Sequence, residues 1–117
     1  MAKKLMALIL GITMSFTSAA SMDDEIKHLL AYVGQTQCQY DRNGTLHSGQ
    51  EAVAHIQKKF DYFKDDIHTT EDFVKYSATK SKMSGKYYHI LCPGKDKVRS
   101  QDWLLAELKR YRQTNAN

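Results

Sequence analysis

Two histidines and a glutamate in the middle of the chain have the residue types and the spacing of a metal site. His47, Glu51 and His55 stand four residues apart, so they would share one face of a helix that ran back through His47. Two imidazoles and a carboxylate can hold Zn²⁺ and leave one position open for a reacting water. Ser48 and Glu51 also form a capping box, which would put His47 outside the helix and occupy Glu51. The spacing therefore leaves open both a metal site and an ordinary helix start.

A second group of polar side chains indicates binding rather than catalysis. It combines a turn that carries directional donors with a flexible cationic loop, and such donors suit a carboxylate, a phosphate or a glycan. The candidate binding residues are Arg42, Asn43, His47, Ser84 and Lys86. The alternative is that Arg42 pairs with Asp41 or Glu51 and that Asn43-Gly44 serves the turn alone.

The charge of the chain argues against a nucleic-acid partner. The 117 residues include 17 Lys and Arg residues and 13 Asp and Glu residues. Lys3 and Lys4 belong to a segment that we expect to be removed, which leaves 15 basic residues. An excess of about two charges is far below the dense basic stripe that a phosphate backbone requires. The lysines between Lys75 and Lys86 are interpreted as an ordinary solvated face.

The N-terminus has the pattern of a bacterial signal peptide. Two lysines precede an uncharged apolar run from Leu5 to Phe16, and the small residues Ser18 and Ala20 fit a cleavage site. The run is shorter than the roughly 20 apolar residues that span a membrane, and no cysteine stands at the cleavage point to carry a lipid. We therefore expect a signal peptide over residues 1–20 and one domain over residues 21–117. The mature protein would be periplasmic or secreted, without stable membrane insertion.

The two cysteines, Cys38 and Cys92, are expected to form a structural disulfide. Export would bring them to an oxidising compartment, where disulfides persist. They lack the C-x-x-C spacing of a redox-active pair. The bridge would close a loop of roughly 55 residues and contribute about 4 kcal/mol in the chain-entropy estimate. A bonded pair would also direct Tyr40, Tyr88 and Ile90 to one side of a sheet, because side chains alternate along strands.

Local signals predict the elements that must position these residues. Capping residues at Ser21, Ser48, Thr69 and Ser100 precede apolar residues at helical spacing. Asn43-Gly44 between short alternating segments indicates a two-residue hairpin, and residues 86–92 are rich in strand formers. The expected fold is α+β, with a small antiparallel sheet (the hairpin plus one strand) packed against about four helices.

Several short motifs resemble a family of small exported bacterial proteins of unknown function. The resemblance extends over nearly the whole mature chain. It is carried by Arg42-Asn43-Gly44 with His47, Glu51-Ala52 with His55, Thr69 to Val74, Ser84-Gly85-Lys86 with Tyr88, and Pro93-Gly94. The resemblance implies a periplasmic or secreted setting and a domain that stands alone, and it implies no particular activity.

The sequence therefore favours an exported, non-enzymatic binding or inhibitor-type module. Its expected partner is an envelope protein or a small anionic ligand. The chain has no P-loop and no dinucleotide-binding fingerprint, so no cofactor is expected. A small metal-dependent hydrolase that uses His47, Glu51 and His55 is the alternative.

Overall fold

The computed structural model describes residues 20–115, which form an α+β fold. The α+β class expected from the sequence is confirmed. Of the signal peptide predicted for residues 1–20, all but Ala20 lies outside the described residues. The helices are α1 (Met22–Gln35), α2 (Gly49–Tyr62), α3 (Thr70–Ser77), α4 (Ser100–Asn115) and the short 3₁₀ helix η2 (Lys64–Asp66). The strands are β1 (Gln39–Arg42), β2 (Thr45–His47), β3 (His89–Leu91) and β4 (Val98–Arg99).

Reciprocal side-chain caps begin α1, α2 and α3, as predicted. The hydroxyl groups of Ser21, Ser48 and Thr69 each accept a hydrogen bond from the backbone amide three residues later, and an acidic side chain at that later position accepts from the cap amide. These bonds satisfy amides that the first helical turn leaves without partners. The three helix starts are therefore determined locally.

The hairpin between β1 and β2 closes at the predicted Asn43-Gly44 turn. Both residues have positive φ angles, 54° for Asn43 and 87° for Gly44, which is the geometry of the turn that fits twisted strands. Arg42 pairs with Thr45 across the turn, and the Asp41 carboxylate accepts a hydrogen bond from the Gly44 amide at 2.8 Å. The turn thus leaves Arg42 as the last residue of β1.

The four strands are antiparallel and lie in the order β2-β1-β3-β4. β4 adds one short strand to the hairpin and single strand expected from the sequence, and β3 is shorter than residues 86–92. Ser100 was predicted to cap the last helix, but it is the first residue of α4, and its buried hydroxyl group lies 2.6 Å from the Tyr40 hydroxyl instead. The Ser100 side chain therefore joins α4 to the centre of the sheet.

A disulfide joins Cys38 to Cys92, as predicted. It connects the residue before β1 to the residue after β3, next to the pairing of Gln39 with Leu91. Tyr40, Tyr88 and Ile90 are all buried, which agrees with the face assigned to them from the bridge. The bridge and the strand pairing therefore support the same register.

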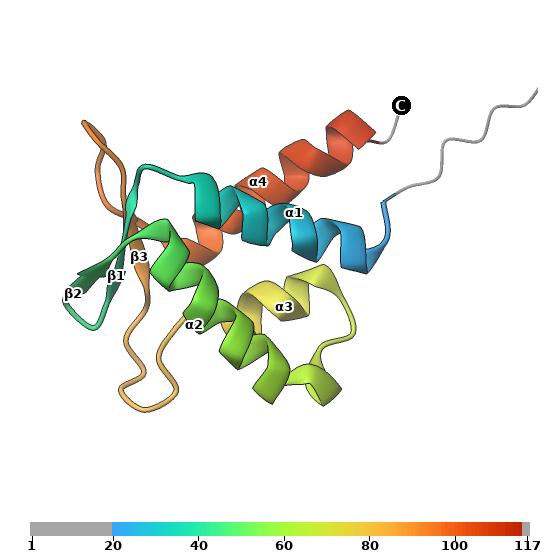
Figure 1. Cartoon of the computed structure of the whole chain (residues 1–117), viewed down its shortest axis with the longest axis horizontal. Coiled ribbons are helices and arrows are strands. Elements are labelled where there is room, and N and C mark those ends of the chain that lie inside the picture. The colour runs from blue at the N-terminus through green and yellow to red at the C-terminus, as the bar shows by residue number, and fades with distance from the viewer. Residues whose placement is uncertain (1–19, 116–117) are drawn as a thin grey trace, which may run out of the picture.

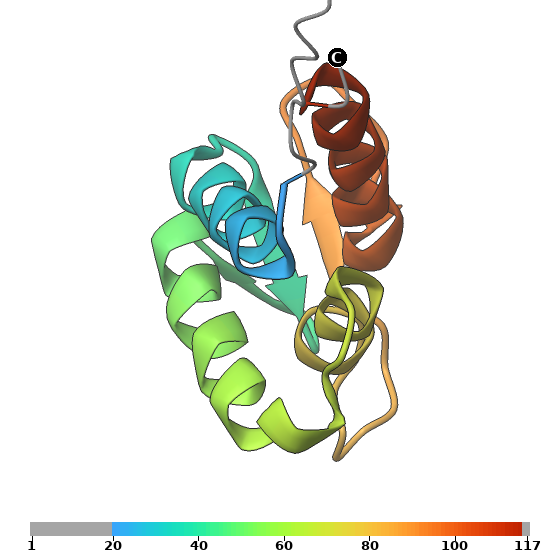
Figure 2. The ribbon, with the colours of Figure 1, turned by 90° about the vertical axis from the view of Figure 1, so that its right-hand side faces the viewer.

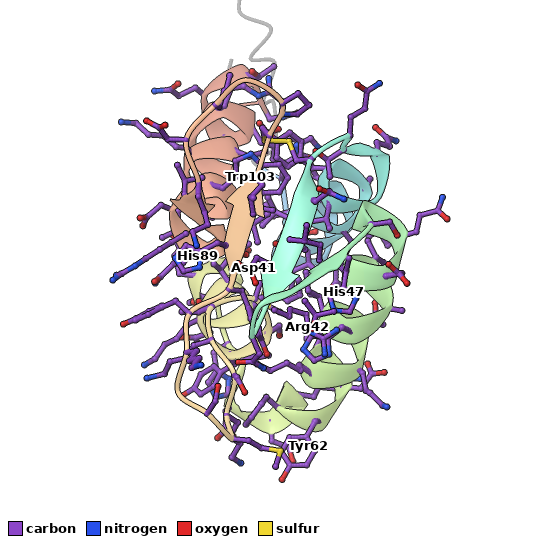
Figure 3. All side chains as sticks on the ribbon, turned by 90° about the vertical axis from the view of Figure 1, so that its left-hand side faces the viewer. Asp41, Arg42, His47, Tyr62, His89 and Trp103 are labelled. Atoms are coloured by element: carbon purple, nitrogen blue, oxygen red, sulfur yellow. A yellow bond between two sulfur atoms is a disulfide. The ribbon has the colours of Figure 1, made fainter. Side chains whose placement is uncertain are left out.

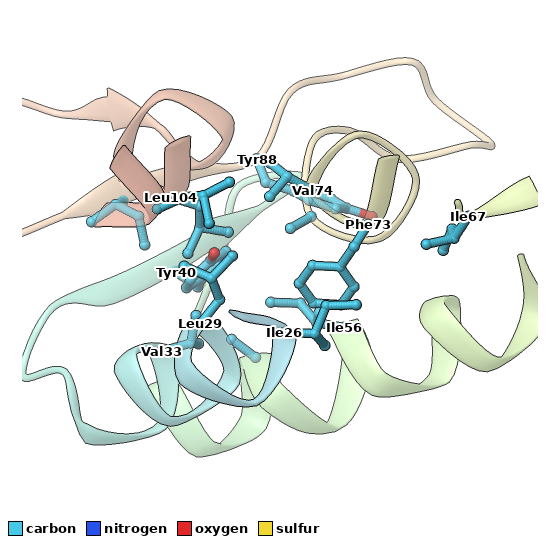
Figure 4. Packing of buried hydrophobic residues seen from close by; sticks show 14 residues of the cluster. Ile26, Leu29, Val33, Tyr40, Ile56, Ile67, Phe73, Val74, Tyr88 and Leu104 are labelled. Carbon is cyan, nitrogen blue, oxygen red and sulfur yellow. The ribbon is translucent and has the colours of Figure 1, made fainter. Parts of the chain in front are cut away.

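The helices cover one face of the sheet and leave the other face without a helix. The helices lie to the right of the sheet in Figure 1, in front of it in Figure 2 and behind it in Figure 3. α1 packs on α2, α2 packs on α3, and α4 contacts both α1 and α3. Figure 4 shows side chains of the helices and of the inner sheet face meeting in one core. Its buried hydrophobic members are Ile26, Leu29, Val33, Tyr40, Ala52, Ile56, Ile67, Phe73, Val74, Ala78, Tyr88, Ile90, Leu104 and Leu108. In residues 20–115 no helix is long and apolar enough to cross a membrane.

The end of α1 approaches the start of α2 closely at a glycine. A Cβ atom built on Gly49 would lie 2.2 Å from the backbone oxygen of Val33. Contacts that short do not occur between real side chains and backbone, so the helices could not approach this closely with a larger residue. Gly49 thereby fixes how α2 starts against α1, and α2 carries much of the site described next.

Candidate ligand-binding groove

A groove of about 430 Å³ lies between α2, the hairpin tip and the segment that leads into β3. Its volume is within the range of small-molecule sites. We call it the cationic groove. It is lined by Arg42, Asn43, His55, Lys58, Lys59, Tyr62, Phe63, Ser81, Lys82, Met83 and Tyr88. Figure 3 shows Arg42 beside α2 and Tyr62 near the far end of that helix.

The charge of this groove has one sign. Its lining contains Arg42, Lys58, Lys59 and Lys82, together with His55, and none of the lining residues is acidic. Within residues 20–115, none of these four cations takes part in an ion pair. The groove is therefore a concave surface whose four cations have no ion-pair partner among the described residues.

Arg42 is not paired with the carboxylates next to it in sequence or in space. Asp41 accepts the Gly44 amide and lies 3.8 Å from the Lys97 ammonium, whereas Glu51 accepts the Ser48 amide. The Nε atom of Arg42 is buried and has no hydrogen-bond partner. The alternative interpretation, in which Arg42 pairs with Asp41 or Glu51, is therefore wrong. Because the protein itself covers that Nε atom, an anion in the groove would have to contact the terminal nitrogens of the Arg42 guanidinium.

His55 and Tyr88 form the polar floor of the groove. The His55 Nε2 atom lies 3.2 Å from the Tyr88 hydroxyl group. Burial, together with the positive charges of Arg42 and Lys59, lowers the pKa of His55 to about 4. Burial raises the pKa of Tyr88, and the adjacent Arg42 opposes that rise. Both groups are consequently neutral at pH 7, so the Tyr88 hydroxyl keeps its proton.

Lys59 is held at the floor by a contact with the segment opposite α2. Its ammonium donates a hydrogen bond to the Lys80 backbone oxygen at 2.8 Å and lies 5.0 Å from the centre of the Tyr88 ring. Burial, with a further contribution from Arg42 and Lys82, lowers the pKa of Lys59. A lowered lysine pKa means that the surroundings disfavour the charged form of the side chain. A bound anion would stabilise that charged form.

The other end of the groove is aromatic and exposed. The Lys82 ammonium lies 5.2 Å from the Tyr62 ring centre and 5.1 Å from that of Phe63. The Tyr62 side chain is 72% exposed, and Met83 is 99% exposed. The groove therefore passes from a polar, partly buried floor to an open apolar rim.

The structure brings only part of the predicted binding set together. Arg42 and Asn43 line the groove, and the Ser84 hydroxyl donates to the Asn43 side-chain oxygen at 2.7 Å, which joins the loop to the hairpin tip. Lys86 instead lines a separate hollow beyond the hairpin tip, with Tyr87 and Arg99 among others. His47 does not line the cationic groove, and its Nδ1 atom lies 3.9 Å from the Glu51 carboxylate.

The lysines that supply most of the positive charge of the groove were not among the predicted binding residues. Lys58 and Lys59 follow His55 by three and four residues on α2, so they lie near the same helical face, and this spacing was a usable signal. Lys82 was assigned to a solvated face, and no local signal tells that it faces α2. Tyr62 was considered only as part of a general contact area, and Tyr88 only as a core residue.

The predicted metal ligands are not gathered into a site. Glu51 is engaged by the capping box, His47 is nearest to Glu51, and His55 faces Tyr88. Residues 20–115 contain no group of three or more His, Cys, Asp or Glu side chains that could hold a metal ion. The geometry gives the metal-dependent hydrolase no support.

Comparison with known proteins assigns the fold unit to a family. Residues 20–112 match the model of a family of unknown function, DUF5329. The chain belongs to this family. It is also similar to the uncharacterised protein YfeK of Salmonella typhimurium, with 38% identity over 47 residues. That alignment covers 40% of this chain and 39% of the relative. No solved structure matches the chain. The family expected from the sequence motifs is thus confirmed as one without an assigned function.

Proposed function

We propose that this protein is an exported, non-enzymatic binding module whose cationic groove holds a small anionic ligand. The observation that carries the proposal is a groove lined by Arg42, Lys58, Lys59 and Lys82 and by no acid, in which none of these cations has an ion-pair partner among residues 20–115. A guanidinium forms strong, directional hydrogen bonds with phosphate and carboxylate groups. The Arg42 side chain is therefore the expected anchor of the anion.

The surrounding residues have complementary roles in this proposal. Lys59 is fixed by its bond to the Lys80 backbone oxygen, so little side-chain freedom remains to be lost when an anion binds. The Tyr88 hydroxyl adds a neutral donor beside the guanidinium. The groove thus offers positive charges and neutral donors to an anion, which suits binding.

Export is the second part of the proposal. The apolar N-terminal run behind two lysines supports it, and so does a disulfide of a kind that is rare in reducing compartments. In the periplasm or outside the cell, the groove would encounter anionic metabolites or envelope components rather than nucleic acids.

Titration with methyl phosphate at pH 7.5 tests the groove directly. We expect the backbone amide NMR signals of the hairpin tip, of α2 near His55 and of residues 81–88 to shift in one saturable process. Arg42→Gln should weaken the affinity at least tenfold, because a charge-assisted hydrogen bond contributes about 1.5–3 kcal/mol.

Arg99→Gln is the matched control for Arg42→Gln. Arg99 is an exposed cation on β4 whose guanidinium lies 4.0 Å from the Tyr87 ring centre, outside the groove. This variant loses the same charge and should keep the affinity of the natural sequence. Equal affinities of the Arg42→Gln and Arg99→Gln variants would refute a specific role for Arg42, and the absence of saturable shifts would refute the groove as an anion site.

A further inference from the structure

The two ends of the cationic groove differ in chemistry along the length of α2. His55 and Lys59 lie at the polar floor, and Tyr62 lies at the open end of the same helix. His55 and Tyr62 are seven residues apart, which corresponds to about 10 Å along a helix axis. Figure 3 shows Arg42 and Tyr62 at different heights beside α2. A ligand that occupies the whole groove must therefore satisfy two environments.

The open end has apolar side chains that the described fold does not cover. Met83 is 99% exposed and Tyr62 is 72% exposed, and both line the groove opposite each other, from the 81–88 segment and from α2. Phe63 adds a partly buried ring that contacts Tyr62 at 4.8 Å between centroids. Exposed apolar groups gathered at one end of a groove are typical of a site that binds the apolar part of a ligand.

Positive charge continues up to this apolar end. Lys82 lies over the Tyr62 and Phe63 rings, and its aliphatic stem adds apolar surface while its ammonium stays in water. A purely polar anion would leave Tyr62 and Met83 without contacts, and an uncharged apolar ligand would leave Arg42 and Lys59 uncompensated. A molecule with one anionic head and one apolar chain suits both ends.

We propose that the ligand of this groove is a monomeric, single-chain anionic amphiphile. Its phosphate or carboxylate head contacts Arg42, Lys59 and the Tyr88 hydroxyl. Its alkyl chain follows α2 towards Tyr62, Phe63 and Met83. This inference rests on the proposed function, because it needs the anion site at Arg42, and it adds the chemical class of the ligand.

A pair of phosphate monoesters with the same head separates the two claims. Methyl phosphate and octyl phosphate, the latter below its critical micelle concentration, are titrated at pH 7.5 against the oxidised mature chain. We expect octyl phosphate to bind at least tenfold more tightly, since each buried methylene adds about a fourfold gain in affinity. Its additional NMR shifts should fall on Tyr62, Phe63 and Met83.

The Tyr62→Ser, Met83→Ser double variant tests the path of the chain. Both side chains are exposed, so the domain should stay folded. The preference for octyl phosphate should fall at least fivefold. Leu46→Ser is the control, because Leu46 is an exposed apolar residue on β2 that does not line the groove.

Each contrary outcome has a distinct meaning. Equal affinities for the two esters would overturn the amphiphile and leave the anion site intact, whereas binding of neither ester would overturn both. An octyl preference that survives in the double variant would overturn the path along Tyr62 and Met83. Binding to phosphatidylglycerol vesicles without binding of monomeric octyl phosphate would overturn the inference in favour of a membrane surface.

Discussion

The side chain of His55 connects the chemistry of the groove to the stability of the domain. Its ring is partly buried against Tyr88, and burial with neighbouring positive charges lowers its pKa from 6.5 to about 4. A histidine of this kind stays neutral in the folded chain while the unfolded chain takes up a proton. The contribution of neutral His55 to the free energy of unfolding is therefore fully present above about pH 6.5, and it is lost as the pH falls towards 4.

Thermal unfolding between pH 7.5 and pH 5.5 should show this loss. We expect the Tm of the natural sequence to fall over that interval, and the fall should be smaller for His55→Gln, which cannot take up the proton. The window avoids most of the titration of Glu25, Glu71 and Glu107, whose ion pairs lower their pKa values below the ordinary carboxylate range. His68→Gln, an exposed histidine, should behave like the natural sequence, and an undiminished fall in His55→Gln would contradict the assignment.

At the scale of the elements, the contact between α1 and α2 depends on one missing side chain. A Cβ atom on Gly49 would meet the Val33 oxygen at 2.2 Å, whereas one on Gly34 would lie 3.4 Å from a methyl group of Val53. Overpacking of this kind typically costs 1–3 kcal/mol. Where a helical glycine has space for a Cβ atom, in contrast, its change to alanine raises the free energy of unfolding by roughly 0.5–1 kcal/mol.

Urea unfolding of Gly49→Ala and Gly34→Ala should consequently give opposite signs. Gly49→Ala is expected to lower the free energy of unfolding by about 1–3 kcal/mol, and Gly34→Ala is expected to leave it unchanged or raise it slightly. A stable Gly49→Ala variant would mean that α2 can shift away from α1, and the groove would then be expected to change with it.

The elements that the sequence predicts correctly are those with local signals. Ser21, Ser48 and Thr69 cap helices through bonds to residues three positions away, and Asn43-Gly44 forms its turn through its own φ angles. β4 was not predicted, because Val98 and Arg99 become a strand only by pairing with β3. Arg42 was selected from the turn, whereas Lys82 was missed because its position opposite α2 depends on the fold of a loop.

The net charge of the whole molecule does not show where its charged residues lie. The mature chain has a small excess of basic residues, and an even distribution would have no functional meaning. Away from the groove, some charges compensate one another: Arg112 on α4 binds Glu25 of α1 and Glu71 of α3 at 2.6–3.2 Å. The four groove cations have no such partners in the described residues, and the groove lining contains no acidic residue, so positive charge gathers there. Composition alone cannot show this segregation.

The disulfide has a topological consequence for the groove. Every residue that lines the cationic groove lies between Arg42 and Tyr88, inside the covalent ring that Cys38 and Cys92 close over a separation of 54 residues. α1 and α4 lie outside the ring. Closing a ring of that size raises the free energy of the unfolded chain by about 4 kcal/mol, so we expect oxidation to stabilise the fold that forms the groove. Methyl phosphate titration with and without a reductant would measure this: the reduced chain should bind more weakly, and equal affinity would mean that the groove assembles before the ring is closed.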